Sequence, residues 1–198
     1  MEPTQPVEYP LYFVDGDMAV YWSLDTRGVR LDAPGITFTS ERETRTIGFG
    51  EIRSIRLQTT FAQANETGIG ICQIQFRHYR ELTIYSGDCY GRFDEDQRQH
   101  YIDFVHDLHR RIPAQDRKRI DFKAGLSETR HMIVSAAMIA GALLFGLLPA
   151  FLLLRYPSFE TLAIAATAGG FVYAGWRSWT KNRPGGYSPD RVSEDLLP

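Results

Sequence analysis

Residues 132–154 read Met-Ile-Val-Ser-Ala-Ala-Met-Ile-Ala-Gly-Ala-Leu-Leu-Phe-Gly-Leu-Leu-Pro-Ala-Phe-Leu-Leu-Leu and carry no charged side chain. As a helix, these 23 residues would be about 34 Å long, which exceeds the roughly 30 Å thickness of the hydrocarbon core of a bilayer. A buried helix of this length in a soluble protein would need a polar stripe or a much larger protein around it. We therefore predict that residues 132–154 span a membrane.

A second apolar segment, residues 159–176, follows after a link of only four residues. Its 18 residues would form a helix of about 27 Å, which is the lower limit for a span. Glu160 lies in the first turn, where a charge costs less than at the centre of the bilayer, and Tyr173 and Trp176 lie near the far end, where interfacial aromatic residues gather. We predict a second span and therefore a two-helix transmembrane hairpin; an amphipathic or re-entrant segment is the alternative.

The basic residues flank this hairpin unevenly. Several precede the first span and several follow the second, whereas the link contains Arg155 alone. The positive-inside rule therefore places both termini in the cytoplasm. Anionic head groups attract each Lys or Arg near the membrane surface by about 1 kcal/mol. The residues expected to set the topology and contact lipids are Arg117, Lys118, Arg119, Lys123, Arg130, Arg177 and Lys181.

The composition of the whole chain conceals the apolar segments. The 198 residues are 43% hydrophobic and 23% charged, with a formal net charge of -2, as in an ordinary soluble protein. A charge this close to zero disfavours a nucleic-acid binder, which needs a basic surface. Cys72 and Cys89 precede the hairpin, and in the cytoplasm we expect them to be reduced thiols rather than a disulfide.

The residues before the hairpin show the alternation that is typical of strands. Apolar side chains recur at every second position over residues 18–24 and 72–76, and also over 55–61, where Thr59 takes one place in the row. The period then changes, because apolar residues recur every three or four positions on one stripe of a helix over residues 94–112. Strands followed by one helix predict an α+β domain.

Residues 20–31, residues 47–57 and the closing helix, in this order, resemble the bacterial pleckstrin-homology-like (PH-like) domains of small membrane proteins. The resemblance implies a curved antiparallel sheet capped by a C-terminal helix, and it brings no catalytic residues. The chain then divides into an N-terminal extension (1–15), a PH-like cytoplasmic domain (16–113), a basic juxtamembrane linker (114–131), the transmembrane hairpin (132–179) and a flexible C-terminal tail (180–198).

No familiar catalytic motif is present: the chain lacks a P-loop, a dinucleotide-binding glycine pattern after a strand, HExxH and GxSxG. We therefore expect no enzyme activity, no catalytic residue, no cofactor and no metal. One cluster on the predicted helix contains residue types that bind metals: His100, Asp103, His106, Asp107 and His109. Because these positions lie opposite the apolar stripe, a solvated polar face is the favoured interpretation over a metal site.

Both predicted spans carry small residues at four-residue spacing, which lets helices approach closely. Such rows suit either the interface within the hairpin or contact with another membrane protein. The residues expected to pack in this way are Ala137 with Gly141, Ala142 with Gly146, and Ala166 with Gly170 and Ala174.

Together these features predict a multi-pass protein of the bacterial inner membrane. Its expected partners are membrane lipids and either another membrane protein or a second copy, without nucleic acid. We expect it to be a scaffold, or an accessory or assembly subunit, of a membrane complex. The alternative is a sensor of anionic lipids or membrane stress that acts through the PH-like domain and residues 117–123.

Overall fold

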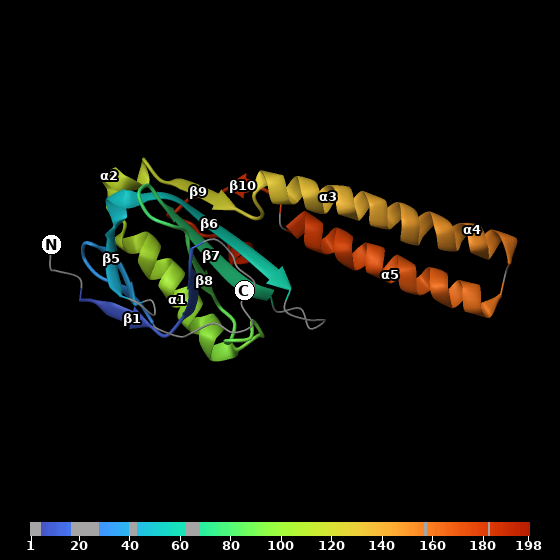
Figure 1. Cartoon of the computed structure of the whole chain (residues 1–198), viewed down its shortest axis with the longest axis horizontal. Helices are drawn as coiled ribbons and strands as arrows, with labels where there is room; N and C mark the ends of the chain where they lie inside the picture. Colours follow the sequence, from blue (N-terminus) through green and yellow to red (C-terminus); the bar gives the residue numbers. More distant parts are fainter. Residues whose placement is uncertain (1–4, 17–27, 40–42, 62–67, 157, 182) are drawn as a thin grey trace. The chain divides into compact units, whose positions relative to one another are not determined.

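The computed structural model describes residues 5–16, 28–39, 43–61, 68–156, 158–181 and 183–198. The chain divides into two compact units (Figure 1). The first contains the strands and runs up to Gly125, then takes in Gly185–Pro198 after a long interruption. The second unit is the interruption itself, Leu126–Pro184, and it is helical.

The first unit contains two sheets. The four-stranded sheet is antiparallel and has the order β1 (Val7–Tyr9), β3 (Val29–Leu31), β4 (Gly35–Thr39) and β5 (Thr44–Gly48). The six-stranded sheet has the order β10 (Gly185–Gly186), β9 (Asp121–Ala124), β6 (Ile52–Phe61), β7 (Gly68–Phe76), β8 (Leu82–Tyr85) and β2 (Tyr12–Asp15). In this sheet β6 and β9 are parallel, and the other neighbours pair antiparallel.

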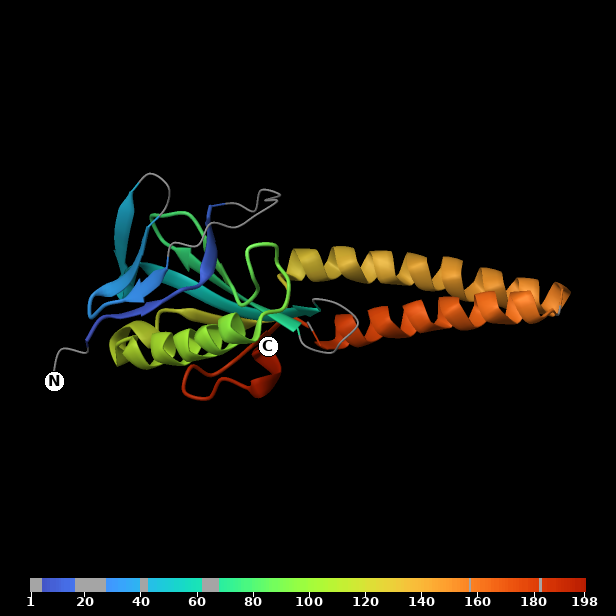
Figure 2. The same cartoon turned by 90° about the horizontal axis from the view of Figure 1, so that it is seen from below.

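Helix α1 (Glu95–Arg111) covers one face of the strands (Figure 2). It begins where the Asp94 carboxylate accepts a hydrogen bond from the backbone N–H of Gln97 at 3.0 Å, which caps the first turn. Its predicted apolar stripe is buried, and Phe104 and Leu108 have no exposed surface. The stripe joins the inward-facing residues of both sheets in one core, so the α+β class is confirmed.

The N-terminal boundary differs from the sequence-based expectation. Residues 1–15 were expected to form an extension outside the domain, yet β1 joins the four-stranded sheet and β2 joins the six-stranded sheet. Tyr9, Leu11 and Phe13 are buried in the core between them. The predicted strand over residues 18–24 lies outside the described residues.

The predicted linker and the predicted flexible tail are also structured. The linker forms α2 (Ala114–Arg117) and β9, and β9 pairs with β6 in the middle of the sheet. The tail forms β10, which pairs with β9, and then a 3-10 turn at Glu194–Leu196. Leu196 and Leu197 pack against the core of the first unit, so this part of the tail is not a free end.

The second unit is a pair of packed helices. The first helix runs as α3 (Glu128–Ala142), a π-helical turn at Leu143–Leu147 and α4 (Leu148–Arg155), and the second is α5 (Phe159–Lys181). Pro149 explains the π-helical turn, because its nitrogen carries no hydrogen to bond the carbonyl of Phe145 one turn earlier.

Among the described residues, one helix, Glu128–Arg155, is long and apolar enough to cross a membrane. The expected second span, residues 159–176, lies within α5, but this helix is not apolar enough to meet the same criterion of length and hydropathy. The reason is its composition: Glu160 occupies the first turn, and Ala, Gly and Thr make up much of the rest.

Candidate functional site

The faces that pack the two helices together differ from the rows of small residues, which were expected to serve either this interface or contact with another membrane protein. The buried and half-buried residues of α5 recur every three or four positions, and they form a narrow seam toward α3 and α4. This seam consists of Thr161, Ala165, Ala168, Val172, Gly175 and Trp179. Gly175 makes close approach possible, because a Cβ atom there would lie 2.8 Å from the sulfur of Met138.

The expected packing residues lie largely outside this seam. Four of them, Ala137, Gly146, Ala166 and Gly170, are exposed, whereas Gly141 and Ala142 are half-buried. The side chain of Ala174 is outside what the structure describes. A Cβ atom added to Gly141, Gly146 or Gly170 would meet nothing within 4 Å, so these glycines do not mediate close packing within the hairpin.

An aromatic cluster joins the start of α3 to the end of α5. The His131 ring stacks on Trp179 at 5.5 Å between centroids, and the indole N–H of Trp179 donates to the Ser135 hydroxyl at 2.8 Å. Trp176 and the guanidinium of Arg183 also contact the Trp179 ring, at 5.0 Å and 4.8 Å. Polar and aromatic side chains therefore hold the two ends of the hairpin side by side.

The outer faces of both helices carry large apolar side chains in contact with solvent. On the first helix these are Met132, Ile133, Val134, Ile139, Leu143, Leu144, Phe145, Leu147, Phe151 and Leu154. On α5 they are Phe159, Leu162, Ile164, Phe171, Tyr173 and Trp176. Leu154 is 86% exposed and Phe159 is 84% exposed. A soluble protein rarely presents a continuous apolar surface of this size to water.

The expected lipid-contact residues have different environments. Lys118, Arg119, Arg130 and Arg177 are exposed, and Lys123 lies 3.7 Å from the Asp121 carboxylate. The side chain of Lys181 is outside the described residues.

Arg117, which was expected to contact lipids, makes structural contacts within the first unit. Its guanidinium donates to the carbonyls of Ile112 at 3.0 Å and His109 at 2.8 Å. It therefore supplies hydrogen bonds to carbonyl groups at the C-terminal end of α1 that have no partner within the helix. The same group forms an ion pair with Asp190 in the returning tail. Arg117 therefore connects helix α1 to the segment that follows the hairpin.

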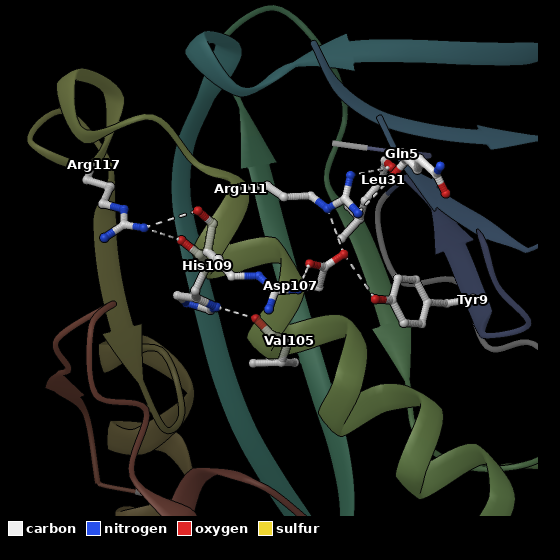
Figure 3. A network of polar contacts seen from close by, with 9 residues as sticks. Gln5, Tyr9, Leu31, Val105, Asp107, His109, Arg111 and Arg117 are labelled. Carbon is white, nitrogen blue, oxygen red and sulfur yellow. Dashed lines mark hydrogen bonds and ion pairs between the residues drawn. The ribbon is translucent and has the colours of Figure 1, made fainter. Parts of the chain in front are cut away.

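Two residues of the His/Asp face of α1, which was predicted to be solvated, are buried. Asp107 accepts hydrogen bonds from Arg110 and Arg111, each at 2.6 Å, and from the Tyr9 hydroxyl at 3.1 Å (Figure 3). Arg111 also donates to the carbonyls of Leu31 and Gln5. The side chains of Asp107 and Arg111 are each 5% exposed, so this is an ion pair inside the protein.

The charge state of Asp107 follows from these contacts. Burial by itself raises the pKa of the carboxyl, but the hydrogen bonds from Arg110 and Arg111 outweigh it, and the pKa lies below its usual value. Burial and the negative charge of Asp107 raise the pKa of the Tyr9 hydroxyl to about 12. The network therefore consists of a carboxylate, two guanidinium groups and a neutral phenol at neutral pH.

His109 is the second buried residue of this face. Its Nδ1–H donates to the Val105 carbonyl at 2.6 Å, as Figure 3 shows, which leaves Nε2 to accept from the Tyr187 hydroxyl at 2.8 Å. The rings of Phe122 and Tyr187 lie against the imidazole. Burial lowers the pKa of His109 to about 4, so the ring is neutral at pH 7.

The returning tail, defined here as residues 185–198, has three further anchors on the first unit. Tyr187 packs on Phe122 at 5.6 Å between ring centroids, and its N–H donates to the Phe122 carbonyl at 3.3 Å. At the other end, the Arg98 guanidinium donates to the carbonyl of Pro198 at 2.7 Å. Gly70 leaves room there, because a Cβ atom would lie 2.9 Å from Cδ of Pro198.

The same region contains polar atoms without a hydrogen-bond partner in the part of the chain that the structure describes. They include the hydroxyls of Thr59 and Tyr101 and the amide oxygen of Gln97. Thr59 lies opposite Gly70 in the β6–β7 pair, and the Tyr101 ring lies against Gly70. Burial raises the pKa of the Tyr101 hydroxyl well above its usual value, so it remains protonated.

We expect the change Tyr101→Phe to leave the free energy of unfolding unchanged or to raise it by up to about 1 kcal/mol, because it removes a buried hydroxyl without a partner. The matched change Tyr9→Phe removes a hydroxyl that donates to Asp107 and should lower the free energy of unfolding by about 1–3 kcal/mol. Hydrogen exchange of the β6 and β7 amides measures both variants. Equal effects would show that the Tyr101 hydroxyl has a partner in solution.

The described residues contain no group of three or more His, Cys, Asp and Glu side chains that could hold a metal ion. Cys72 is buried, and burial raises the pKa of its thiol, which makes it a poor nucleophile. Neither the known protein families nor the curated proteins include one that matches this chain. The candidate features are therefore defined by geometry within each unit: the apolar helix pair in the second unit, and the returning tail on α1 and β9 in the first.

Proposed function

We propose that this chain is an integral protein of the bacterial inner membrane, in which α3–α4 and α5 cross the bilayer as a hairpin. The observation that supports this most is the large apolar surface on the outer faces of both helices. Lipid would cover these side chains, and each Å² of apolar surface removed from water contributes roughly 25 cal/mol. Helix α5 has 23 residues, and about 34 Å of helix is enough for a second crossing.

Charge and aromatic residues support an orientation with both termini in the cytoplasm. Arg130, Arg177 and Arg183 lie near the ends of the hairpin that connect to the first unit, and Trp176 and Trp179 lie among them. The turn between the helices carries Arg155. This asymmetry follows the positive-inside rule.

Within the membrane, we assign the protein the role of a scaffold or accessory subunit. Ala166 and Gly170 are exposed one turn apart on α5, and neither takes part in the seam with the first helix. Small residues that are unused within a hairpin are suited to the close approach of a partner helix. The first unit then supplies a cytoplasmic domain, and its two sheets and closing helix support the resemblance to PH-like domains.

The alternative, a sensor of anionic lipids, has weaker support. It depends on the basic segment before α3, but Arg117 there is bound to Asp190 and the carbonyls of α1. Lys123 is close to Asp121. Pairing with carboxylates reduces the charge that these residues can present to a lipid surface.

The proposal predicts that the protein resists extraction from membranes by alkaline carbonate and co-purifies with a membrane protein or a second copy in mild detergent. The change Gly170→Leu should reduce this co-purification at least tenfold, because a large side chain prevents close approach. Leu162→Ile, at another exposed position of α5, is the matched control and should have no effect. Extraction by carbonate would contradict the membrane assignment, and a strictly monomeric protein without a reproducible partner would contradict the scaffold role.

A further inference from the structure

The strands that flank the helical unit are neighbours in one sheet. Ala124 pairs with Gly185 and Lys123 pairs with Gly186, although the whole of Leu126–Pro184 lies between them in the chain. Because β9 and β10 are adjacent, the chain leaves the first unit and returns to it at the same sheet edge. While β9 and β10 are paired, the chain before the first helix and the chain after the second helix are therefore both held at this sheet edge.

The strand pair is short, and side-chain contacts hold the rest of the returning tail. Tyr187 binds the His109 ring, Asp190 pairs with Arg117, and Leu196 and Leu197 pack on the core. These contacts are spread along the whole length of residues 185–198. They can form only if that whole segment reaches the first unit.

We infer that the returning tail is a clasp that reports the topology of the hairpin. The inference rests on the proposed membrane insertion of the two helices. When both helices have crossed, residues 185–198 are again on the side of the first unit, and the clasp closes. When only the first helix has crossed, the same residues lie beyond about 30 Å of hydrocarbon, and none of the contacts can form.

The second helix is the one for which such a clasp matters. Glu160 and the many small residues make α5 less apolar than the first helix. Among the described residues, the first helix is the one that is long and apolar enough to cross a membrane. Insertion of α5 is therefore the weaker of the two crossings. By thermodynamic linkage, closure of the clasp favours insertion of α5 by the same factor by which insertion favours closure.

Closure also changes the surface that the first unit presents to the cytoplasm. The tail covers His109 and Phe122 and adds an outer strand to β9, which would otherwise be a sheet edge. A chain with only one crossing therefore presents an open edge and uncovered aromatic side chains. The clasp thus distinguishes correctly inserted chains from incompletely inserted ones.

The test uses the full chain in membranes with Cys72 and Cys89 replaced by Ser and a cysteine pair made by Lys123→Cys and Gly186→Cys. These two positions are opposite each other in β9 and β10, so oxidation should join them in most chains when the clasp is closed. Phe171→Arg places a charge in the middle of α5 and should lower the cross-linking yield at least tenfold. It should also expose the thiol introduced by Gly186→Cys to a membrane-impermeant reagent on the periplasmic side.

Phe171→Leu keeps the apolar face and is the matched control, which should cross-link like the parent. A second variant acts on the clasp alone: Tyr187→Ala should increase the periplasmic labelling of the thiol at position 186 severalfold, as linkage requires. Low cross-linking in a parent that resists carbonate extraction would overturn the clasp. Unchanged cross-linking and labelling in both Phe171→Arg and Tyr187→Ala would also overturn it. A parent that carbonate extracts but that still cross-links would overturn the proposed function instead.

Discussion

Replacing Asp107 by alanine is expected to lower the free energy of unfolding of the first unit by about 3–5 kcal/mol. The change leaves the guanidinium of Arg111 inside the protein without its carboxylate, and this side chain is only 5% exposed. It also removes the acceptor for the Tyr9 hydroxyl. Hydrogen exchange of the β6 and β7 amides in the full chain, held in detergent micelles, measures the loss.

Asp103→Ala is the matched control, because Asp103 lies one turn earlier on the same helix and is exposed. Its side chain accepts one hydrogen bond, from Gln99, and its loss should cost less than about 0.5 kcal/mol. The double change Asp107→Ala with Arg111→Met should be less destabilising than Asp107→Ala alone, since no charge is then left buried. Equal losses for Asp103→Ala and Asp107→Ala would show that the buried ion pair does not form in solution.

The position of Asp107 and His109 on α1 explains why the sequence suggested a solvated face. At 3.6 residues per turn, the two residues lie roughly 100° to either side of the apolar stripe, on opposite flanks. One flank meets Tyr9 on β1 and the other meets Tyr187 in the returning tail. The periodic pattern of apolar residues identifies the face of the helix that packs on the core of the domain. It contains no information about other segments that cover the polar residues on either side of that face.

The sequence did not predict the strands that cover these flanks, and the reason is physical. β1 has three residues, β2 has four and β10 has two, which is too short for an alternation to be recognised. β9 was assigned to a basic linker because it overlaps the run of residues 117–123, in which Arg117, Lys118, Arg119 and Lys123 dominate the composition. By contrast, β6 and β7 are nine or more residues long, and the alternation over residues 55–61 and 72–76 located the greater part of each strand.

The packing face of the helix pair could not be predicted from the sequence either. Small residues occur on several faces of α5, so composition does not select the face that packs. The side chains that do select it are specific: Trp179 binds Ser135, and Gly175 accommodates Met138. Both contacts depend on the register of two antiparallel helices, which the sequence of one helix does not contain.

A fall in pH from 7 to 4 is expected to lower the free energy of unfolding of the first unit by on the order of 3 kcal/mol through His109 alone. Burial lowers the pKa of this ring from 6.5 to about 4 in the folded protein. Between these two values the unfolded chain binds a proton that the folded chain does not. The stabilisation is therefore fully present above pH 6.5 and is lost as the pH falls toward 4.

Urea unfolding at pH 7, 5.5 and 4, followed by near-ultraviolet circular dichroism, measures the total effect, to which carboxyl groups also contribute. The difference between the parent and His109→Gln isolates the contribution of the ring, and this difference should shrink by on the order of 3 kcal/mol from pH 7 to pH 4. Tyr187→Phe should keep most of the parental dependence, because burial is the main cause of the low pKa and the phenyl ring preserves it. A difference that does not vary with pH would mean that water reaches His109. Since the returning tail covers this ring, that result would place the tail away from α1 in solution.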